Sequence, residues 1–437
     1  MALSRLSVAH GDSEGESISK TLQEAGQPIQ WGKQASTVLK KITNPLSVVF
    51  FTILLDKIGE NIIFPILPFV LASYNPNALT IGLTASVSTF FGTLASPVTG
   101  ALADISGRRP IILTCIALNF GALLIFGWAN SLALILVSRA ITGVAMSSNG
   151  ALQAYIADIS TISNRARNLG LIGAAFGLGS IFGPVLGGVL VGFGPKVPIF
   201  ATAGLTAYNL ITAVLFLKET KPQAQGQTAE LRQIKLVKPV IDLLKTPVIN
   251  KVAIGFSAYS FAFSAFTSLL VLALKDLFDW NSSQTSGLFV LLGLTLTVAQ
   301  VWFTGKTVNK LGEYSVNRYG MIATAIALTL IPIASLIKPL SATIIVASAM
   351  LLAIGASFVQ PTSRSMVSGL TPSEKQGVVL GSLASLTNLA NCAGPIVAGL
   401  VYDKTPSGSF LIQAAVILLG AFLLGSNPKH ESECGQT

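Results

Sequence analysis

The sequence predicts an all-α membrane protein with twelve transmembrane helices, from three observations: its low charge, the length of its apolar tracts and a repetition of motifs between its halves. Of the 437 residues, 51% are hydrophobic and 11% are charged, a balance that water-soluble domains do not show. A helix needs roughly 20 apolar residues to cross the hydrocarbon core of a bilayer. Tracts of that length recur from Leu46 to Gly425, and they are too continuously apolar for the strands of a membrane barrel.

The apolar tracts divide the chain into two groups of six. The twelve predicted spans are 46–72, 80–103, 110–129, 131–157, 169–193, 197–217, 252–274, 284–307, 316–336, 342–363, 378–401 and 409–425. They form a first six-helix bundle (46–217) and a second (252–425), joined by a polar cytoplasmic linker (218–251). Residues 1–45 are polar and acidic in part, so we expect a cytoplasmic tail there rather than a cleaved signal. Residues 426–437 are expected to form a second cytoplasmic tail.

Basic residues gather in the loops on one side of the predicted membrane, which accounts for the formal net charge of +10 without a nucleic-acid partner. The loops on this side carry Arg108, Arg109, Arg165, Arg167, Lys218, Lys221, Arg232, Lys235, Lys238 and Lys245. The opposite loops carry little more than Lys196, Lys275, Lys338 and Lys404. By the positive-inside rule we expect both termini to be cytoplasmic, with the chain in the cell (inner) membrane.

The two groups of spans repeat each other. The pair Gly183-Pro184 recurs as Gly394-Pro395 with an offset of 211 residues, and Gly170 recurs as Gly381 with the same offset. The loop at 100–109 is echoed at 305–313. Parallel repeats related by an axis along the membrane normal are typical of rocking carriers, which bind substrate between the repeats near the midplane.

Four segments carry a family resemblance. They are Leu55-Asp56 with Gly59 and Pro65-Ile66-Leu67-Pro68; Gly100 to Pro110; Arg139-Ala140-Ile141-Thr142-Gly143; and Gly179 to Gly188. These segments resemble the major facilitator superfamily, and within it the twelve-helix drug:proton antiporters, with the tetracycline exporters as the nearest likeness. The resemblance covers nearly everything from Leu55 to Tyr402, and it implies the fold of that superfamily, with two pseudo-symmetric six-helix bundles.

Two of these segments imply a functional motif. The resemblance implies that the loop after the second span and the end of the fourth form a cytoplasmic gate that holds the halves together when the cavity opens outward. The gate residues are Gly100, Asp104, Gly107, Arg108, Arg109 and Asp158.

In the fifth span, glycines at a spacing of four leave one helical face bare, so that another helix can approach closely. The resemblance to the antiporter signature favours export over uptake, and its residues are Gly179, Gly183, Pro184, Gly187 and Gly188.

Three charged residues, Asp56, Lys57 and Glu60, lie near the middle of the first span, where each charge costs roughly 2.5 to 3.5 kcal/mol. Lys57 is spaced to pair with Glu60, which leaves one carboxylate without a partner on its own helix. Arg139 in the fourth span is the expected counter-charge. Low dielectric favours the protonated form of a carboxylate, and Asp56 matches the first-span aspartate of the tetracycline-exporter pattern. We therefore expect Asp56, Lys57, Glu60 and Arg139 to couple transport to protons. Lys57 and Glu60 depart from the family pattern, so a purely structural salt-bridge cluster stays open as an alternative.

Polar and aromatic residues of the inner spans are the candidates for contact with a substrate. The polar candidates are Asn61, Asn149, Gln153 and Gln360, and the candidates for an aromatic wall are Tyr259, Phe263 and Phe266.

The sequence thus predicts a secondary active transporter that exports small amphipathic organic molecules or drugs in exchange for protons. We expect no cofactor, because the chain has no Walker loop and its only histidines, His10 and His430, lie in the tails. The three cysteines fit no metal or redox spacing, so neither a metal site nor enzymatic activity is expected. The expected partners are a small-molecule substrate, protons and lipid, with the chain acting as a monomer. A proton symporter, a lipid flippase or a non-transporting membrane assembly protein stay open as alternatives.

Overall fold

The structure, a computed structural model, describes residues 45–63, 67–71, 74, 76–161, 164–220, 238–372 and 376–425. The two predicted tails, residues 221–237 of the predicted linker and the Pro65-Ile66 pair lie outside the described residues.

The described chain is built from helices. Those of the first half are α3 (Pro45–Ile63), α4 (Leu67–Leu71), α5 (Ala78–Ser106), α6 (Arg108–Trp128), α7 (Leu132–Met146), α8 (Ser148–Asp158), α9 (Arg165–Val191) and α10 (Val197–Phe216). Those of the second half are α11 (Lys238–Lys245), α12 (Ile249–Phe278), α13 (Ser282–Val298), α14 (Gly305–Leu311), α15 (Glu313–Leu336), α16 (Ser341–Gly369), α17 (Gln376–Tyr402) and α18 (Pro406–Leu424). A π-helical segment, Ala299–Thr304, joins α13 to α14, and a short 3-10 turn, Lys338–Leu340, precedes α16.

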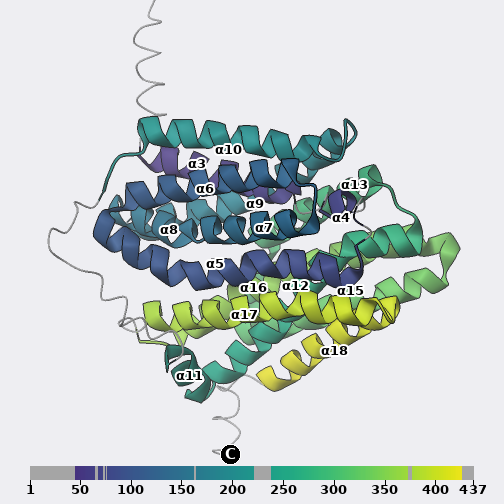
Figure 1. The fold of residues 1–437 in the computed structure, drawn as a ribbon. Helices are drawn as coiled ribbons and strands as arrows, with labels where there is room; N and C mark the ends of the chain where they lie inside the picture. Colours follow the sequence, from purple (N-terminus) through teal and green to yellow (C-terminus); the bar gives the residue numbers. More distant parts are fainter. Residues whose placement is uncertain are drawn as a thin grey trace, which may run out of the picture.

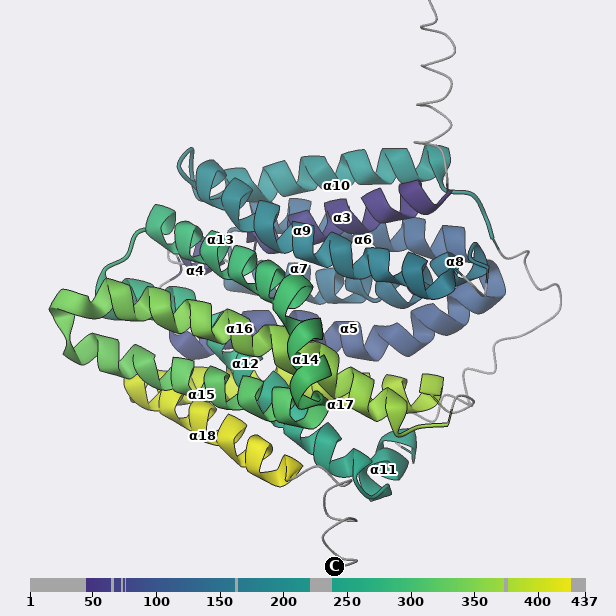
Figure 2. The same ribbon diagram turned by 180° about the vertical axis from the view of Figure 1, so that it is seen from behind.

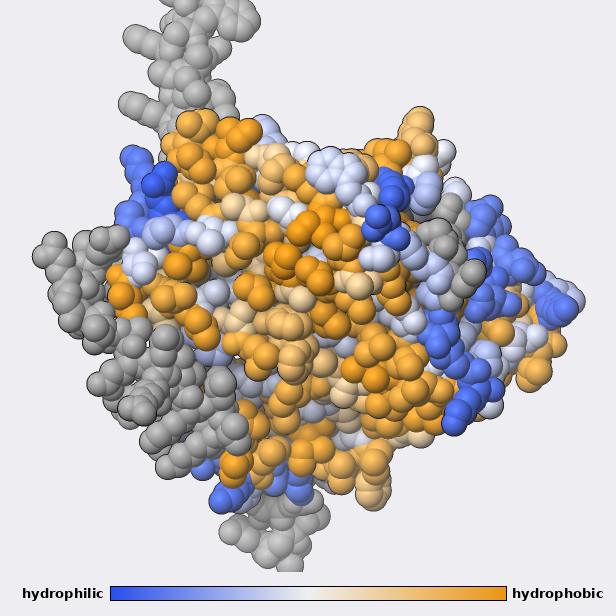
Figure 3. Space-filling model, in the orientation of Figure 1, coloured by the Kyte–Doolittle hydropathy of each residue, from blue (hydrophilic) through white to orange (hydrophobic). Residues whose placement is uncertain are grey.

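The long helices follow the predicted spans. Among the described residues, eleven helices are long and apolar enough to cross a membrane. The first predicted span, made of α3 and α4, is not one of them, since the 19 residues of α3 include Asp56, Lys57 and Glu60. Hydrophobic side chains cover a broad middle band of the surface, and hydrophilic ones gather towards its left and right margins (Figure 3). That band is what a bilayer would surround.

The helices of the two halves form two groups that meet along α5 and α17. In Figure 1, α3, α6 and α10 lie in the upper part and α18 in the lower part, with α5 and α17 side by side between them. The reverse view shows α13 extending between the two groups (Figure 2), and α13 packs against α9 of the first half. The pairs α5 with α17 and α9 with α13 therefore connect the halves.

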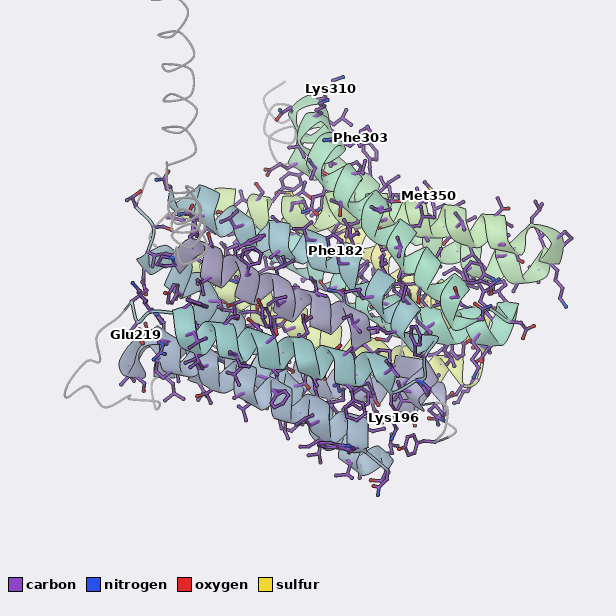
Figure 4. The ribbon with its side chains drawn as sticks, turned by 90° about the horizontal axis from the view of Figure 1, so that it is seen from above. Phe182, Lys196, Glu219, Phe303, Lys310 and Met350 are labelled. Carbon is purple, nitrogen blue, oxygen red and sulfur yellow. The ribbon has the colours of Figure 1, made fainter. Side chains whose placement is uncertain are left out.

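Successive spans run in opposite directions, so the molecule has two ends, named below by their residues. The Asp403 end contains Ala78, Lys196 and Asp403, and the Arg108 end contains Arg108 and Glu219. Lys196 and Glu219 lie at opposite ends of the helices (Figure 4).

The glycine face of α9 packs directly on α3, as its spacing predicts. A Cβ at Gly179 would lie 2.7 Å from the Cβ of Lys57. A Cβ at Gly183 would overlap Asn61, and one at Gly187 would lie 2.9 Å from the carbonyl oxygen of Ile62. Because no side chain fits between the two helices, their backbones come into close contact. This contact fixes the rotation and height of α3 in the bundle.

The same contact recurs in the second half, which confirms the repeat seen in the sequence. Gly394, the counterpart of Gly183, faces the backbone of Phe261 on α12, so α17 packs on α12 as α9 packs on α3. The loops echo each other as well. Gly107 after α5 has φ 97° and ψ 159°, and Gly312 after α14 has φ 77° and ψ 158°. Both have a positive φ that favours glycine.

The α9–α3 contact gives a test of the fold. We expect Gly183→Ala to lower the free energy of unfolding by about 1 to 3 kcal/mol, because the added methyl group overlaps α3 and forces the helices apart. Thermal unfolding of the purified protein in detergent measures the change.

Gly177→Ala on the same helix is the matched control. A Cβ at Gly177 meets nothing within 4 Å, so only the better helix propensity of alanine acts there. Its melting temperature should equal or slightly exceed that of the wild type. Equal melting temperatures for the two variants would contradict the close contact.

Candidate functional site

A polar cavity of about 560 Å³ lies between the two halves. Its charged lining residues are Asp56, Lys57, Glu60 and Arg139. Its amide lining residues are Asn119, Asn149, Asn388 and Asn391. Hydroxyl groups come mainly from α5 and α12, including Thr84, Ser88, Thr89, Ser264, Thr267 and Ser268. Lining residues thus come from both halves, so the cavity lies where a carrier of this architecture binds its substrate.

The first-span charges reach this cavity as an ion pair and a separate carboxylate. The Nζ of Lys57 lies 2.6 Å from Oε2 of Glu60, which confirms the predicted pair. Lys57 is 2% exposed and Glu60 is 41% exposed, so the lysine is packed inside the bundle while its partner is accessible to solvent. Asp56 lines the cavity and forms no ion pair within the described residues. Packing on α9 holds Lys57 in place and so orients its helical neighbours.

Arg139 lines the same cavity, but the expected ion pair between it and a first-span carboxylate is absent from the described residues, so that expectation is wrong. Its guanidinium carbon lies 4.5 Å from the ring centroid of Phe126 on α6. The reason is the orientation of α7, whose Ser138 donates a hydrogen bond to the carbonyl of Ala122 on the same helix α6. This side of α7 therefore faces α6 rather than α3.

Of the polar residues predicted to contact substrate, the structure places only Asn149 in the cavity wall. Asn61 donates a 2.8 Å hydrogen bond to the carbonyl of Lys57 and packs against Gly183. Gln153 is exposed, and Gln360 lies beside the hydroxyl of Tyr259. Neither glutamine lines the cavity.

The predicted aromatic wall is a packing feature of the second half, so this prediction is wrong as well. Tyr259 and Phe266 are each 1% exposed, and Tyr259 stacks on Phe263 with ring centroids 5.5 Å apart. The cavity face of α12 carries Ser264, Thr267 and Ser268 instead. Their spacing of three and four residues is a sequence signal that could have identified this face.

The predicted gate residues form a network at the Arg108 end. Arg108 pairs with Asp104 at 2.7 Å and with Asp158 at 3.3 Å. Glu219, which sequence reasoning missed, accepts hydrogen bonds from the backbone N–H groups of Arg108 and Arg109 at the start of α6. A carboxylate at a helix N-terminus is favourable because it satisfies free donors and complements the helix dipole. These contacts lie within the first half, and the role of the network in holding the halves together stays a prediction.

The rest of the gate loop fits this network. A Cβ at Gly107 would lie 2.5 Å from the Glu219 carboxylate, so glycine is needed there for space as well as for its backbone angles. Arg109 donates a 2.8 Å hydrogen bond to the carbonyl of Val214. Gly100 has open space around it, so packing does not explain the glycine at that position.

At the Asp403 end, α5 and α17 contact each other along a strip that sequence reasoning did not identify. Asp403 accepts hydrogen bonds from the N–H groups of Ala78, at 2.7 Å, and Leu79, at 3.2 Å. One helical turn further along α5, Gly82 faces the backbone of Pro395. Ser86 then donates a 2.7 Å hydrogen bond to the carbonyl of Cys392. We call this series of contacts the α5–α17 strip.

The second connection between the halves lies towards the same end. Gly188 of the predicted antiporter motif faces Ser286 near the start of α13. Towards the Arg108 end the continuation of this helix diverges from its neighbours, and Phe303 and Lys310 project away from the bundle (Figure 4). The side chain of Pro184 lies outside the described residues. The halves are thus held together at the Asp403 end.

No group of three His, Cys, Asp or Glu residues in the described part of the chain could hold a metal ion.

A helical bundle of membrane-spanning length, with two repeats around a central cavity, is the architecture of a membrane transporter. The sequence matches the Major Facilitator Superfamily over residues 49–347 and 318–434, and the chain belongs to that family. The family consists of transporters rather than enzymes.

Two relatives in sequence have names that refer to drug resistance. Tetracycline resistance protein, class G, of Vibrio anguillarum is 28% identical over 360 residues, which cover 80% of this chain and 88% of that protein. Multidrug resistance protein 2 of Bacillus subtilis (strain 168) is 27% identical over 396 residues, which cover 87% of this chain and 96% of the relative.

The fold is also similar to solved transporter structures. The crystal structure of the human organic anion transporter MFSD10 (TETRAN) matches with a TM-score of 0.67 at 25% identity, over 87% of this chain and 98% of that one. A POT family transporter in complex with 5-aminolevulinic acid matches with a TM-score of 0.74 at 14% identity, over 87% and 95% of the two chains. The latter likeness concerns the fold alone.

The α5–α17 strip predicts a conformational effect of Asp403. We expect Asp403→Asn to make Cys392 several-fold more reactive towards a thiol reagent, because losing the carboxylate weakens the contact with the α5 N-terminus and lets the strip separate more often. The measurement is the rate of maleimide labelling in a protein whose Cys115 and Cys434 are replaced by serine.

Asp279→Asn is the matched control, since Asp279 is an exposed acidic residue that ends α12. It should leave the labelling rate of Cys392 unchanged. An unchanged rate in Asp403→Asn would show that the carboxylate does not hold the strip together.

Proposed function

We propose that this transporter is a proton-coupled antiporter that exports small amphipathic organic molecules by alternating access. The observation that carries the proposal is Asp56, a carboxylate in the wall of the central cavity without an ion-pair partner in the described residues. A carboxylate in such a place can bind and release a proton as water reaches it or leaves it. No cofactor is needed, because the proton gradient supplies the driving force.

The ion pair of Lys57 and Glu60 supports this role for Asp56. Lys57 is the nearest cation in the sequence, and its bond to Glu60 leaves Asp56 as the acid next to the pair. Asp56 lies one residue before Lys57, which packs on the bare face of α9. A movement of α3 relative to α9 would therefore change the surroundings of this carboxylate directly. In our proposal, proton binding at Asp56 and rearrangement of the bundle are coupled through this contact.

The charge distribution supports an orientation. Arg108, Arg109, Lys218, Lys238 and Lys245 lie in segments at the Arg108 end, and an excess of basic residues marks the cytoplasmic side. We therefore propose that the Arg108 end and both termini are cytoplasmic, in the cell (inner) membrane, with the protein acting as a monomer. Contacts between the halves lie towards the Asp403 end, so this conformation is one that admits a molecule from the cytoplasm.

The relatives and the glycine motif favour export. Names of the sequence relatives refer to tetracycline and multidrug resistance, which for a membrane transporter means removal of drugs from the cell. The cavity combines hydroxyl and amide groups with apolar residues such as Ile63, Leu67 and Leu123. That mixture suits molecules that are partly polar and partly apolar.

The proton-coupling role of Asp56 has a direct test. We expect Asp56→Asn to abolish uphill accumulation of substrate in inside-out vesicles with an imposed pH gradient, because an amide does not take up a proton. Downhill exchange of substrate should stay within about twofold of the wild type. The substrate for the assay is the compound to which expression of the protein gives the greatest tolerance in a growth-inhibition panel.

Asp242→Asn, at an exposed position of α11, is the control and should accumulate substrate like the wild type. An Asp56→Asn protein that still drives accumulation would remove the basis of the proposal. Loss of downhill exchange in the same variant would indicate a damaged cavity instead of lost coupling. In that case an Asp56→Glu protein distinguishes the two explanations. It should restore accumulation if a titrating carboxylate at this position is required.

A further inference from the structure

The guanidinium group of Arg139 has no hydrogen-bond or ion-pair partner in the described part of the chain. Nε and Nη2 are both shielded from solvent and without a partner, and the side chain is 8% exposed although the residue lines the cavity. The guanidinium carbon lies over the face of the Phe126 ring.

A second unpartnered group lies next to it. Thr142, three residues further along α7, also lines the cavity, and its hydroxyl oxygen is buried without a hydrogen bond. Residues three apart on a helix share a face, so Arg139 and Thr142 border the cavity from the same side of α7. Asn119 of the neighbouring helix α6 lines the same cavity. The wall near Arg139 therefore carries polar groups and one positive charge.

Leaving a buried cation unpaired is costly, typically by several kcal/mol. The chain does not supply its counter-charge, because Glu60 is bonded to Lys57 and Asp56 forms no pair with Arg139 in the described residues. Phe126 offers a cation–π contact, which offsets part of the cost but satisfies no N–H group. A group from outside the chain is the partner that this geometry lacks.

We propose that Arg139 binds an acidic group of the transported molecule, in particular a carboxylate. The inference rests on the proposed function and specifies its substrate class as organic molecules with a carboxylate in addition to their apolar part. Asp56 is a separate point on the wall of the same cavity. In our proposals Asp56 binds the proton and Arg139 binds the acid, so the two charges have separate ligands.

The test compares two dyes that differ only at the acid. A rhodamine with a free carboxyl group and the methyl ester of the same rhodamine share the cationic ring system, and the ester has lost the carboxylate. Fluorescence polarisation measures the binding of each dye to the purified full chain in detergent, without any proton gradient. We expect the wild type to bind the free acid more tightly than the ester. Arg139→Gln should weaken binding of the acid about tenfold or more, and binding of the ester less than twofold.

Two further variants complete the experiment. Arg139→Lys keeps the charge without the planar pair of donors and should give an intermediate affinity for the acid. Arg318→Gln, at an exposed position of α15, is the matched control and should bind both dyes like the wild type. Binding of the ester also reports whether each variant is folded.

Several outcomes would overturn the inference. Equal affinity of the wild type for the two dyes, including no measurable binding of either, would do so. An equal loss of affinity for both dyes in Arg139→Gln would assign the residue a structural role. These results are independent of the vesicle assay, in which an Asp56→Asn protein can lose proton coupling while the difference between acid and ester persists.

Discussion

Close contact between the backbones of α9 and α3 is the constraint on which the functional part of this protein depends. A membrane interior gives little preference for one rotation of an apolar helix over another, so shape has to fix the orientation. The bare face of α9 fixes the orientation of α3, because the backbone at Gly179 lies so close to the Cβ of Lys57 that no side chain fits between them. The charged residues of α3 consequently reach the cavity instead of lipid. Gly394 provides the corresponding contact between α17 and α12.

Charges inside the bundle have different surroundings. Lys57 and Glu60 satisfy each other at 2.6 Å, so this pair lowers its own cost of burial. Asp56 and Arg139 line the same cavity without such a pair. In our proposals these two charges of opposite sign have two ligands, a proton for Asp56 and an acidic group for Arg139.

Each end of the molecule uses a carboxylate on a helix N-terminus, with different consequences. Glu219 binds the start of α6 within the first half, where it stabilises a loop that stays in one rigid group. Asp403 binds the start of α5 across the two halves. In the proposed alternating-access cycle the halves separate at the end where they touch, so the second contact breaks during each cycle. Single hydrogen bonds are modest in free energy, which keeps such a contact reversible.

The sequence by itself determined the transmembrane helices, their order, the repeat and the pair of Lys57 with Glu60. Each of these follows from composition or from spacing along one helix, which needs no knowledge of neighbours. Only the tertiary structure decided which faces of the helices line the cavity. It places Arg139 on the Phe126 ring, turns Tyr259 and Phe266 into the packed core, and joins Asp403 to Ala78 across 325 positions of sequence. The physical reason is that a helix apolar on nearly all sides carries little periodic signal for its rotation, apart from hydroxyl spacings such as the one on α12, so packing against other helices sets it.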